Sequence, residues 1–326
     1  MPVERTPVQR RLLQNKPEIP CQPVQSCLGD PRSGFEAVAL GYDFEYQTCS
    51  NFFEVRRAAD SDLLYLYPQP CPEALAAIYP PNYIPFQFQL LRGPARWARD
   101  FIQGTKAKAI LALAGQDGKI LDVGTGSGML VRQIARVKHS KSNIYANDFS
   151  ESALAPLKKE GFQTIPGRAE LLETPERFQV ISLNQVLEHL QNPVAVVRRL
   201  ALLLAPGGSL FIETPNTDSP DARLFRRGYW GGYHIPRHFW LFSESSLRQL
   251  LGETGLTVKD VRYLASPVFW VQSFHHALLD RGWFALARRI SEKNPLLLAP
   301  ATLVDLTILC FGGKTSNIRI VAEKPH

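Results

Sequence analysis

Residues 120–130 read ILDVGTGSGML, an apolar run that ends in an acid and continues into three glycines at alternate positions. Such an apolar run is typical of a buried β-strand, and the residues after Gly128 have the spacing of a helix. A glycine-rich turn between a strand and a helix lets a nucleotide approach bare backbone. The stretch therefore predicts the first βα unit of a nucleotide-binding α/β fold.

Short apolar runs alternate with helical patterns from this stretch to the end of the chain, which is typical of βαβ units and a parallel sheet. About fifty residues, 265–314, separate the last two expected strands, and we expect a helical insertion there because a hairpin loop is shorter. The expected strands are KILDV (119–123), NIYAN (143–147), FQTIP (162–166), FQVISLN (178–184), SLFIETPN (209–216), LTVKDVRYLA (256–265) and SNIRIVAEKP (316–325).

The composition is that of an ordinary globular protein, with 326 residues, 45% of them apolar and 21% charged. The formal net charge is +7, but the basic residues are scattered, and we expect no nucleic-acid partner. Five cysteines form no C-x-x-C pair and the first residues do not resemble a signal peptide, so a cytoplasmic location is expected. The apolar stretch 294–312 is interrupted by Pro300 and Asp305. We expect it to pack on the protein as an amphipathic helix, with peripheral membrane contact or a substrate-gating role as the less favoured alternatives.

The glycine spacing separates several classes of nucleotide loop. A dinucleotide-binding loop needs a third glycine where this chain has Met129, and a phosphate-binding P-loop needs a G-K-[ST] that does not follow. What remains is D-x-G-x-G-x-G starting at Asp122, which resembles motif I of the class I S-adenosylmethionine (SAM) dependent methyltransferases. An acid at this position also suits a ligand that carries an ammonium and a sulfonium, whereas it would repel a pyrophosphate.

This resemblance implies a seven-stranded Rossmann-like sheet whose last strand is antiparallel, with helices on both faces. It implies a SAM-dependent methyltransferase that releases S-adenosylhomocysteine and needs no metal. We expect three segments: an irregular N-terminal appendage (1–70), a helical cap or entry segment (71–118), and the SAM-binding domain with its helical insertion (119–326).

The cofactor site is expected along the carboxyl ends of the strands. Asp148 ends the second strand twenty residues after Gly128, which is the offset of an acid that binds ribose hydroxyls. By resemblance Phe149 lies along the adenine, and GRAELL (167–172) and NQVLEHLQNP (184–193) match further family segments. The expected cofactor-binding residues are Asp122, Gly124, Thr125, Gly126, Gly128, Asp148, Phe149, Ala169, Glu170, Asn184 and Gln185.

The same segments resemble a subgroup that includes the ubiquinone-biosynthesis O-methyltransferases. DLLYLYPQP from Asp62 is similar to the end of an N-terminal zinc ribbon found in some relatives. Aligned on it, three of the four ligand positions carry Val24, Ala58 and Ser61, and only Cys27 is a thiol. Because one thiolate cannot hold a tetrahedral zinc, we expect a degenerate, metal-free ribbon.

Transfer of a methyl group to a hydroxyl requires alignment and the removal of a proton, for which histidine is the usual base. Histidines follow the fourth strand and lie in WGGYHIPRHFW (230–240) after the fifth. The candidate catalytic residues are His189, His234 and His238, and the candidate substrate-binding residues are Glu188, Tyr229, Trp230, Tyr233 and Arg237.

We expect O-methylation of a small-molecule acceptor such as a natural product, a quinone-like compound or a glycan precursor. Methylation of a sugar or nucleotide sugar, including C-methylation, is an alternative. A nicotinamide oxidoreductase is disfavoured by Asp122 and Met129. A catalytically silent SAM-fold binding protein is the alternative from another class.

Overall fold

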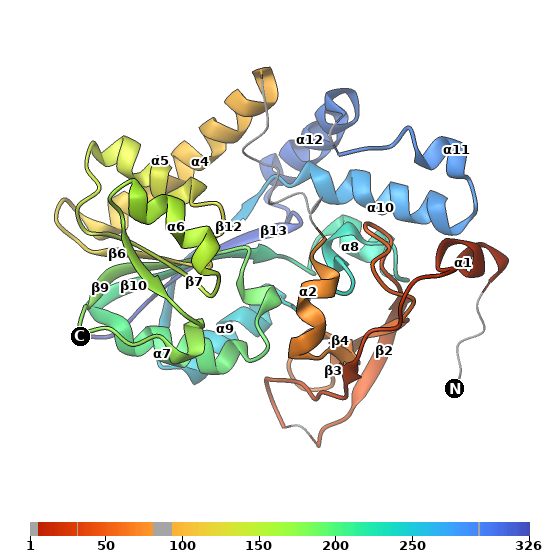
Figure 1. The fold of residues 1–326 in the computed structure, drawn as a ribbon, viewed down its shortest axis with the longest axis horizontal. Coiled ribbons are helices and arrows are strands. Elements are labelled where there is room, and N and C mark those ends of the chain that lie inside the picture. Colours follow the sequence, from red (N-terminus) through yellow and green to blue (C-terminus); the bar gives the residue numbers. More distant parts are fainter. Residues whose placement is uncertain (1–5, 31, 81–92, 293) are drawn as a thin grey trace. The chain divides into compact units, whose positions relative to one another are not determined.

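The computed structural model describes residues 6–30, 32–80, 93–292 and 294–326 (Figure 1). Its largest element is a seven-stranded sheet with the strand order β8-β7-β6-β9-β10-β13-β12. The sheet is mixed and its last strand is antiparallel, which confirms the predicted fold class. The strands are β6 (Ile120–Val123), β7 (Ile144–Asp148), β8 (Gln163–Pro166), β9 (Phe178–Asn184), β10 (Leu204–Pro215), β12 (Thr257–Leu264) and β13 (Asn317–Glu323).

Helices cover this sheet, with α4 and α5 on one side and α7 on the other in the view of Figure 1. The strand β6 is buried at every position because it lies between β7 and β9 and under the apolar side chains of α4 and α5. Burying such continuous apolar runs is the main stabilising contribution to a parallel sheet. The helices are α4 (Gly93–Ala114), α5 (Met129–Lys138), α6 (Glu151–Lys159), α7 (Pro193–Leu203) and α9 (Glu244–Glu253).

A second, antiparallel sheet has the order β11-β4-β3-β2. Three of its strands come from the N-terminal segment, whose irregular pattern does not predict them. The fourth follows the WGGYHIPRHFW loop, with Trp240 opposite Tyr65. The strands are β2 (Phe35–Gly41), β3 (Phe53–Ala58), β4 (Leu64–Tyr67) and β11 (Trp240–Leu241), with a small separate pair of β1 (Cys21–Gln22) and β5 (Gln69–Pro70).

The predicted helical insertion between the last two strands of the large sheet is confirmed. It contains α10 (Pro267–Asp280), α11 (Phe284–Ala287) and α12 (Pro295–Cys310). The N-terminal helix α1 (Pro7–Leu12) reaches it through the amide of Gln9, which donates to Asp280 at 3.1 Å. Among the helices of the described residues, none has the length and apolarity that a membrane span requires.

The chain divides into two compact units. The first unit comprises Met1–Pro80, Thr214–Gln249 and Arg262–Ile318, and therefore holds the small sheet and the insertion. The second unit comprises Pro81–Glu213, Leu250–Val261 and Arg319–His326, and holds most of the large sheet. The expected entry segment 71–118 lies partly outside the described residues.

Candidate active site

The three glycines of the 124–128 loop all have left-handed backbone, with φ of 66° at Gly124, 50° at Gly126 and 71° at Gly128. A Cβ on Gly124 would meet Val186 at 2.7 Å, and one on Gly128 would meet Leu157 at 2.5 Å. A Cβ on Gly126 would meet no described atom within 4 Å. Two glycines thus allow close packing within the protein, and Gly126 leaves its backbone next to open space.

Asp148 ends β7 beside this loop, because β6 and β7 are parallel neighbours whose carboxyl ends lie at the same edge. Its side chain is buried, and its Oδ2 accepts from the amide of Gly126 at 2.9 Å. Its Oδ1 accepts from the amide of Ser150 at 2.9 Å. The next side chain, Phe149, is 79% exposed. A buried carboxylate tied to the loop therefore adjoins an exposed aromatic ring.

Asp122 lies within the sheet, opposite Ser182 of β9, whose hydroxyl donates to Asp122 Oδ1 at 2.7 Å. Burial raises the pKa of Asp122 to about 6, and the hydrogen bond from Ser182 offsets part of this effect. A nearby cation would favour the charged form of this carboxyl group. This makes Asp122 suited to a cationic ligand group.

A buried polar cluster at the end of β9 and β10 was missed by the sequence analysis. The ammonium of Lys106, on α4, lies 2.5 Å from Glu213 Oε2 and donates to Asn184 Oδ1. Arg319 lies 2.6 Å from Glu213 Oε1. Glu213 could have been suspected, since it is an acid in an otherwise apolar buried strand. Lys106 carries no comparable signal in its helix.

Other expected cofactor residues also lie in the second unit. Gln185 has φ 55° and its amide donates to the carbonyl of Glu213 at 2.8 Å. Thr125 is buried. Ala169 begins a short turn of 3-10 helix, and the following Glu170 forms an ion pair with Arg168.

His189 and Glu188 belong to the second unit, on the 3-10 turn Leu187–His189. Glu188 is fully buried and His189 is partly buried. His234 and His238 belong to the first unit. The candidate bases are therefore carried by two different units.

His234 has a carboxylate partner from the N-terminal segment. Its Nδ1 lies 2.6 Å from Oε1 of Glu45, in the connection between β2 and β3, and both side chains are largely buried. The backbone of His234 is left-handed, with φ 40°, which is uncommon and costly for a non-glycine residue. Burial alone would raise the pKa of Glu45, but the adjacent His234 holds it below its ordinary value.

Arg237 anchors the same loop to the same segment. Its guanidinium is fully buried and binds Asp43 through Nη1 at 3.1 Å and Nη2 at 2.9 Å. Its Nε donates to the carbonyl of Ile78 at 2.6 Å, and its plane lies over Tyr46. Arg237 therefore stabilises the conformation of the loop, because a buried bidentate ion pair is costly to break.

The remaining aromatic candidates are held by hydrogen bonds within the first unit. Tyr229 donates to Asp280 at 2.8 Å, and the indole of Trp230 donates to Asp221 at 2.7 Å. Tyr233, buried like Trp230, donates to the carbonyl of Arg226 at 2.8 Å. The expected apolar wall is therefore mostly a packed loop core.

His238 is buried, with Nδ1 at 2.8 Å from the carbonyl of Gly232. Its ring centroid lies 4.8 Å from that of His234.

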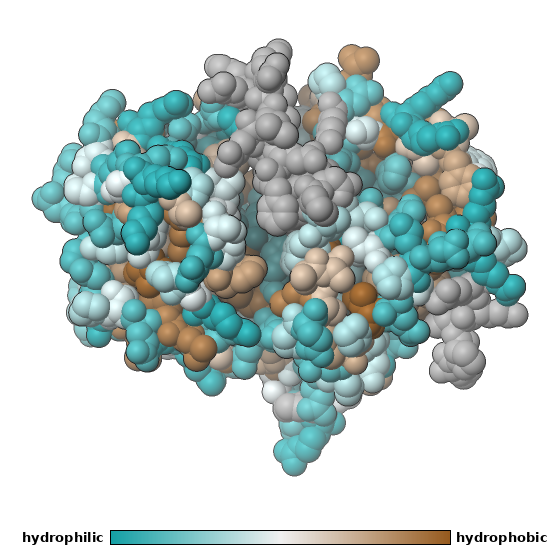
Figure 2. Space-filling model, in the orientation of Figure 1, coloured by the Kyte–Doolittle hydropathy of each residue, from teal (hydrophilic) through white to brown (hydrophobic). Residues whose placement is uncertain are grey.

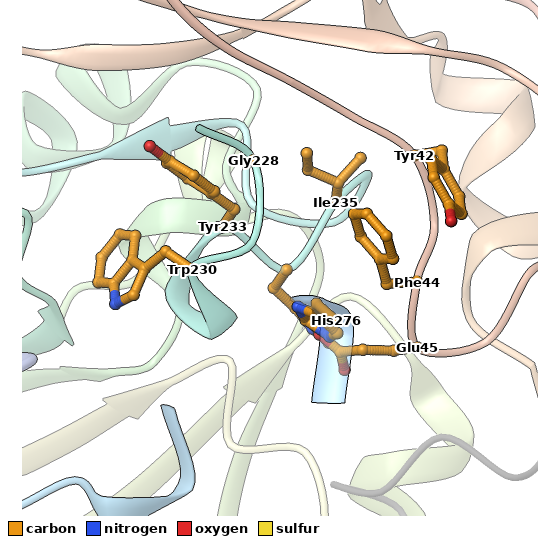
Figure 3. Close-up of a pocket in the computed structure, with 9 residues that line it drawn as sticks. Tyr42, Phe44, Glu45, Gly228, Trp230, Tyr233, Ile235 and His276 are labelled. Carbon is orange, nitrogen blue, oxygen red and sulfur yellow. The ribbon is translucent and has the colours of Figure 1, made fainter. Parts of the chain in front are cut away.

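A small cavity of about 10 Å³, enough for one water molecule, adjoins the His234–Glu45 pair. Figure 3 shows Phe44 and Glu45 on one segment of its wall, Ile235 on a second, and His276 on a helix. Burial lowers the pKa of His276 to about 4, so its ring is neutral. Its Nε2 has no hydrogen-bond partner among the described residues.

The expected degenerate ribbon contains three of the five cysteines, and none of the described cysteines forms a disulfide. Burial, followed by the neighbouring Cys49 and Cys71, raises the pKa of Cys21 to about 12. Burial also raises the pKa of Cys49 to about 11. Protonated thiols are poor metal ligands.

A family model described as "Methyltransferase domain" matches residues 96–261, about half of the chain. A ubiquinone biosynthesis O-methyltransferase of Stutzerimonas stutzeri is 32% identical over 167 residues, covering 46% of this chain and 68% of that protein. One of Pseudomonas aeruginosa is 31% identical over 165 residues, with the same coverage.

A similar fold occurs in the Burkholderia thailandensis 1,6-didemethyltoxoflavin-N1-methyltransferase, crystallised with S-adenosylhomocysteine. That match has a TM-score of 0.50 and 16% identity, and covers 82% of this chain and 97% of the other. Together with the glycine loop, these findings confirm the predicted family and cofactor. The chain belongs to the class I SAM-dependent methyltransferases.

Proposed function

We propose that this methyltransferase methylates a hydroxyl oxygen of a small-molecule acceptor. The names of the relatives that are about 32% identical support transfer to oxygen. The observation that carries the cofactor part of the proposal is the loop 124–128, in which Gly126 leaves open space beside its backbone and donates to the buried carboxylate of Asp148.

SAM, when bound, supplies a methyl group on a sulfonium sulfur. In our proposal the backbone at Gly126 lies against the cofactor, Asp148 accepts from its ribose hydroxyls, and Phe149 lies along its adenine. Each oxygen of Asp148 accepts one backbone hydrogen bond, and a carboxylate oxygen has room for another. The high exposure of Phe149 also supports its role, because an exposed ring next to a buried acid can stack on a planar base.

We propose that Asp122 and the cluster around Glu213 serve the amino-acid part of SAM. The pKa of Asp122 is raised because burial disfavours its charged form, and the ammonium of SAM would supply a positive charge that favours it. Lys106 fixes the side chain of Asn184, at the end of the adjacent strand. Asn184 and Gln185 would then be held ready to hydrogen-bond the cofactor.

His234 is our candidate for the base. When the proton of the neutral ring lies on Nδ1, against Glu45, Nε2 is the basic nitrogen of the imidazole, and in our proposal it takes the acceptor's hydroxyl proton. Glu45 would hold the ring in this tautomer and stabilise the imidazolium that forms. At His238 a backbone carbonyl faces Nδ1, which fixes the same tautomer but supplies no negative charge to stabilise an imidazolium. Two observations on His234 itself support the choice, its 2.6 Å contact with a carboxylate and its left-handed backbone.

Calorimetry and a transfer assay test this proposal together. The full chain is expected to bind SAM and S-adenosylhomocysteine but not NAD, and to transfer labelled methyl from SAM to members of a panel of phenols, hydroxyquinones and sugars. Binding of NAD without SAM would overturn the cofactor assignment. Methyl transfer only to carbon or nitrogen acceptors would overturn transfer to oxygen, and SAM binding without transfer to any acceptor would favour a silent binding protein.

A further inference from the structure

A surface helix usually buries its apolar side chains and exposes its charged ones, and helix α12 does the opposite. Its single acidic or basic residue, Asp305, is 1% exposed. Oδ2 of Asp305 accepts from the amide of Ser266 at 2.6 Å, and Oδ1 accepts from the indole of Trp270 at 2.9 Å. The outer surface of the helix is apolar instead. The exposed large apolar residues here are Leu296, Leu303, Val304 and Leu306, followed by Phe311 just after the helix.

The segment 294–312 was expected to pack on the protein as an amphipathic helix; α12 does pack against α10, but its outward surface is apolar. Leu296 is 81% exposed, Leu303 66% and Phe311 87%. The hydroxyl of Thr307 on this surface donates to the carbonyl of Leu303 at 2.8 Å, which leaves no free donor. Figure 2 shows apolar residues exposed where α12 lies in Figure 1. Contiguous exposed apolar surface of this kind marks an interaction site.

Arginines flank this apolar surface. Helices α11 and α12 both pack against α10, and in the view of Figure 1 they lie on the same side of it. Trp283 and Leu286 at α11 are exposed, and Arg11 of α1 lies over Phe284. The exposed arginines of this region are Arg10, Arg11, Arg281, Arg288 and Arg289. Among the described residues from 281 to 314, the acids are Asp305, which is buried, and Glu292, which is partly buried.

We propose that α12 and the α11 region dock this protein on an anionic lipid surface. The apolar side chains of α12 would enter the boundary between headgroups and acyl chains, and the arginines would contact lipid phosphates. A helix that lies in the membrane interface combines these two features. A second copy of the chain fits less well, because a shared apolar patch would bring two sets of arginines together. The docking does not depend on the identity of the methyl acceptor.

Flotation of the full-length protein with lipid vesicles tests this proposal. We expect binding to vesicles of equal parts phosphatidylcholine and phosphatidylglycerol, weaker binding at high salt, and little binding to phosphatidylcholine alone. Leu303→Ser should lower the partition coefficient about tenfold, since the leucine side chain that would be buried in the membrane is lost. Arg288→Ala combined with Arg289→Ala should lower it about twenty-five-fold, at about fivefold for each arginine.

Matched controls are Leu202→Ser, at a residue of α7 that is 61% exposed, and Arg136→Ala, at an exposed residue of α5. Both should bind vesicles like the wild type. The proposal is overturned by failure to bind anionic vesicles, by equal losses in the controls, or by sedimentation equilibrium showing a dimer that Leu303→Ser dissociates without any vesicle binding. SAM affinity, measured without vesicles, should be the same in all variants. Failure of docking is thereby distinguished from failure of the methyltransferase assignment.

Discussion

Nδ1 of His234 lies 2.6 Å from Oε1 of Glu45, although the two residues are 189 positions apart in the chain. The pair joins the loop after the fifth strand of the large sheet to the connection between two N-terminal strands. A second pair joins the same two segments, because Arg237 binds Asp43. The geometry of the proposed base is therefore set by residues that precede the methyltransferase domain in sequence.

Replacing Glu45 by glutamine should lower kcat roughly tenfold to a hundredfold, because the imidazolium formed at His234 loses its anionic partner. The affinity for SAM should stay unchanged in calorimetry. The control is Glu36→Gln at an exposed position of β2. A loss of SAM affinity or of thermal stability that accompanies the loss of kcat would assign Glu45 a purely structural role.

Replacing Asp148 by asparagine should weaken SAM binding about tenfold to a hundredfold, as expected when a charged acceptor is lost from ribose hydroxyls. Asparagine keeps a carbonyl oxygen that can accept from the amide of Gly126, so the loop should survive. Calorimetry measures the affinity, and thermal unfolding checks the fold. Asp117→Asn, at an exposed residue before β6, is the control. Unchanged affinity in Asp148→Asn would refute the ribose role.

Asp122 should make stability depend on pH. Its folded pKa of about 6 lies above the unfolded value of about 3.9. The folded state therefore binds more protons between these values, and the free energy of unfolding should fall as pH rises through this window, by up to about 3 kcal/mol. Urea unfolding of the wild type and Asp122→Asn, compared at several pH values, isolates this contribution. Parallel curves for the two proteins would contradict it.

The same carboxyl group should link SAM affinity to pH. If the ammonium of SAM favours the charged form of Asp122, binding releases a proton and tightens as pH rises through about 6. Calorimetry in buffers of different ionisation enthalpy measures the proton released. In Asp122→Asn this release should disappear.

Replacing Gly126 by alanine should weaken SAM binding more than it destabilises the protein. The new Cβ meets no described atom within 4 Å, so the cost of folding is that of left-handed backbone, about 1 kcal/mol. The same methyl group would occupy the space that we assign to the cofactor. Gly115→Ala is a matched control, since Gly115 has φ 68° and equally open surroundings. Equal SAM affinity in the two variants would place the cofactor elsewhere.

The sequence was sufficient to predict the large sheet because its signals are local. Each strand is a short apolar run, and the loop from Gly124 to Gly128 requires left-handed backbone that only glycine adopts readily. The helical insertion follows from its length alone. The small sheet could not be predicted, since β11 has two residues and pairs with a strand more than 170 positions earlier.

The candidate site was also predictable only where its signals are local in the sequence. Asp122 and Asp148 were found because they stand at fixed offsets from the glycines. Glu45 and Lys106 were missed because their partners, His234 and Asn184, are distant in sequence. The orientation of α12 was not predicted, because periodicity does not reveal which side of a helix faces the protein. Only the partners of Asp305 decide that.

The small sheet has a consequence for how this enzyme can be divided or recombined. Its strands β2 to β4 lie outside the residues 96–261 that match the family model, yet β11 within that range completes the same sheet. A chimera that exchanges only the matched residues between relatives would separate His234 from Glu45 and Arg237 from Asp43. New acceptor specificities in this lineage would then require the two segments to be inherited together.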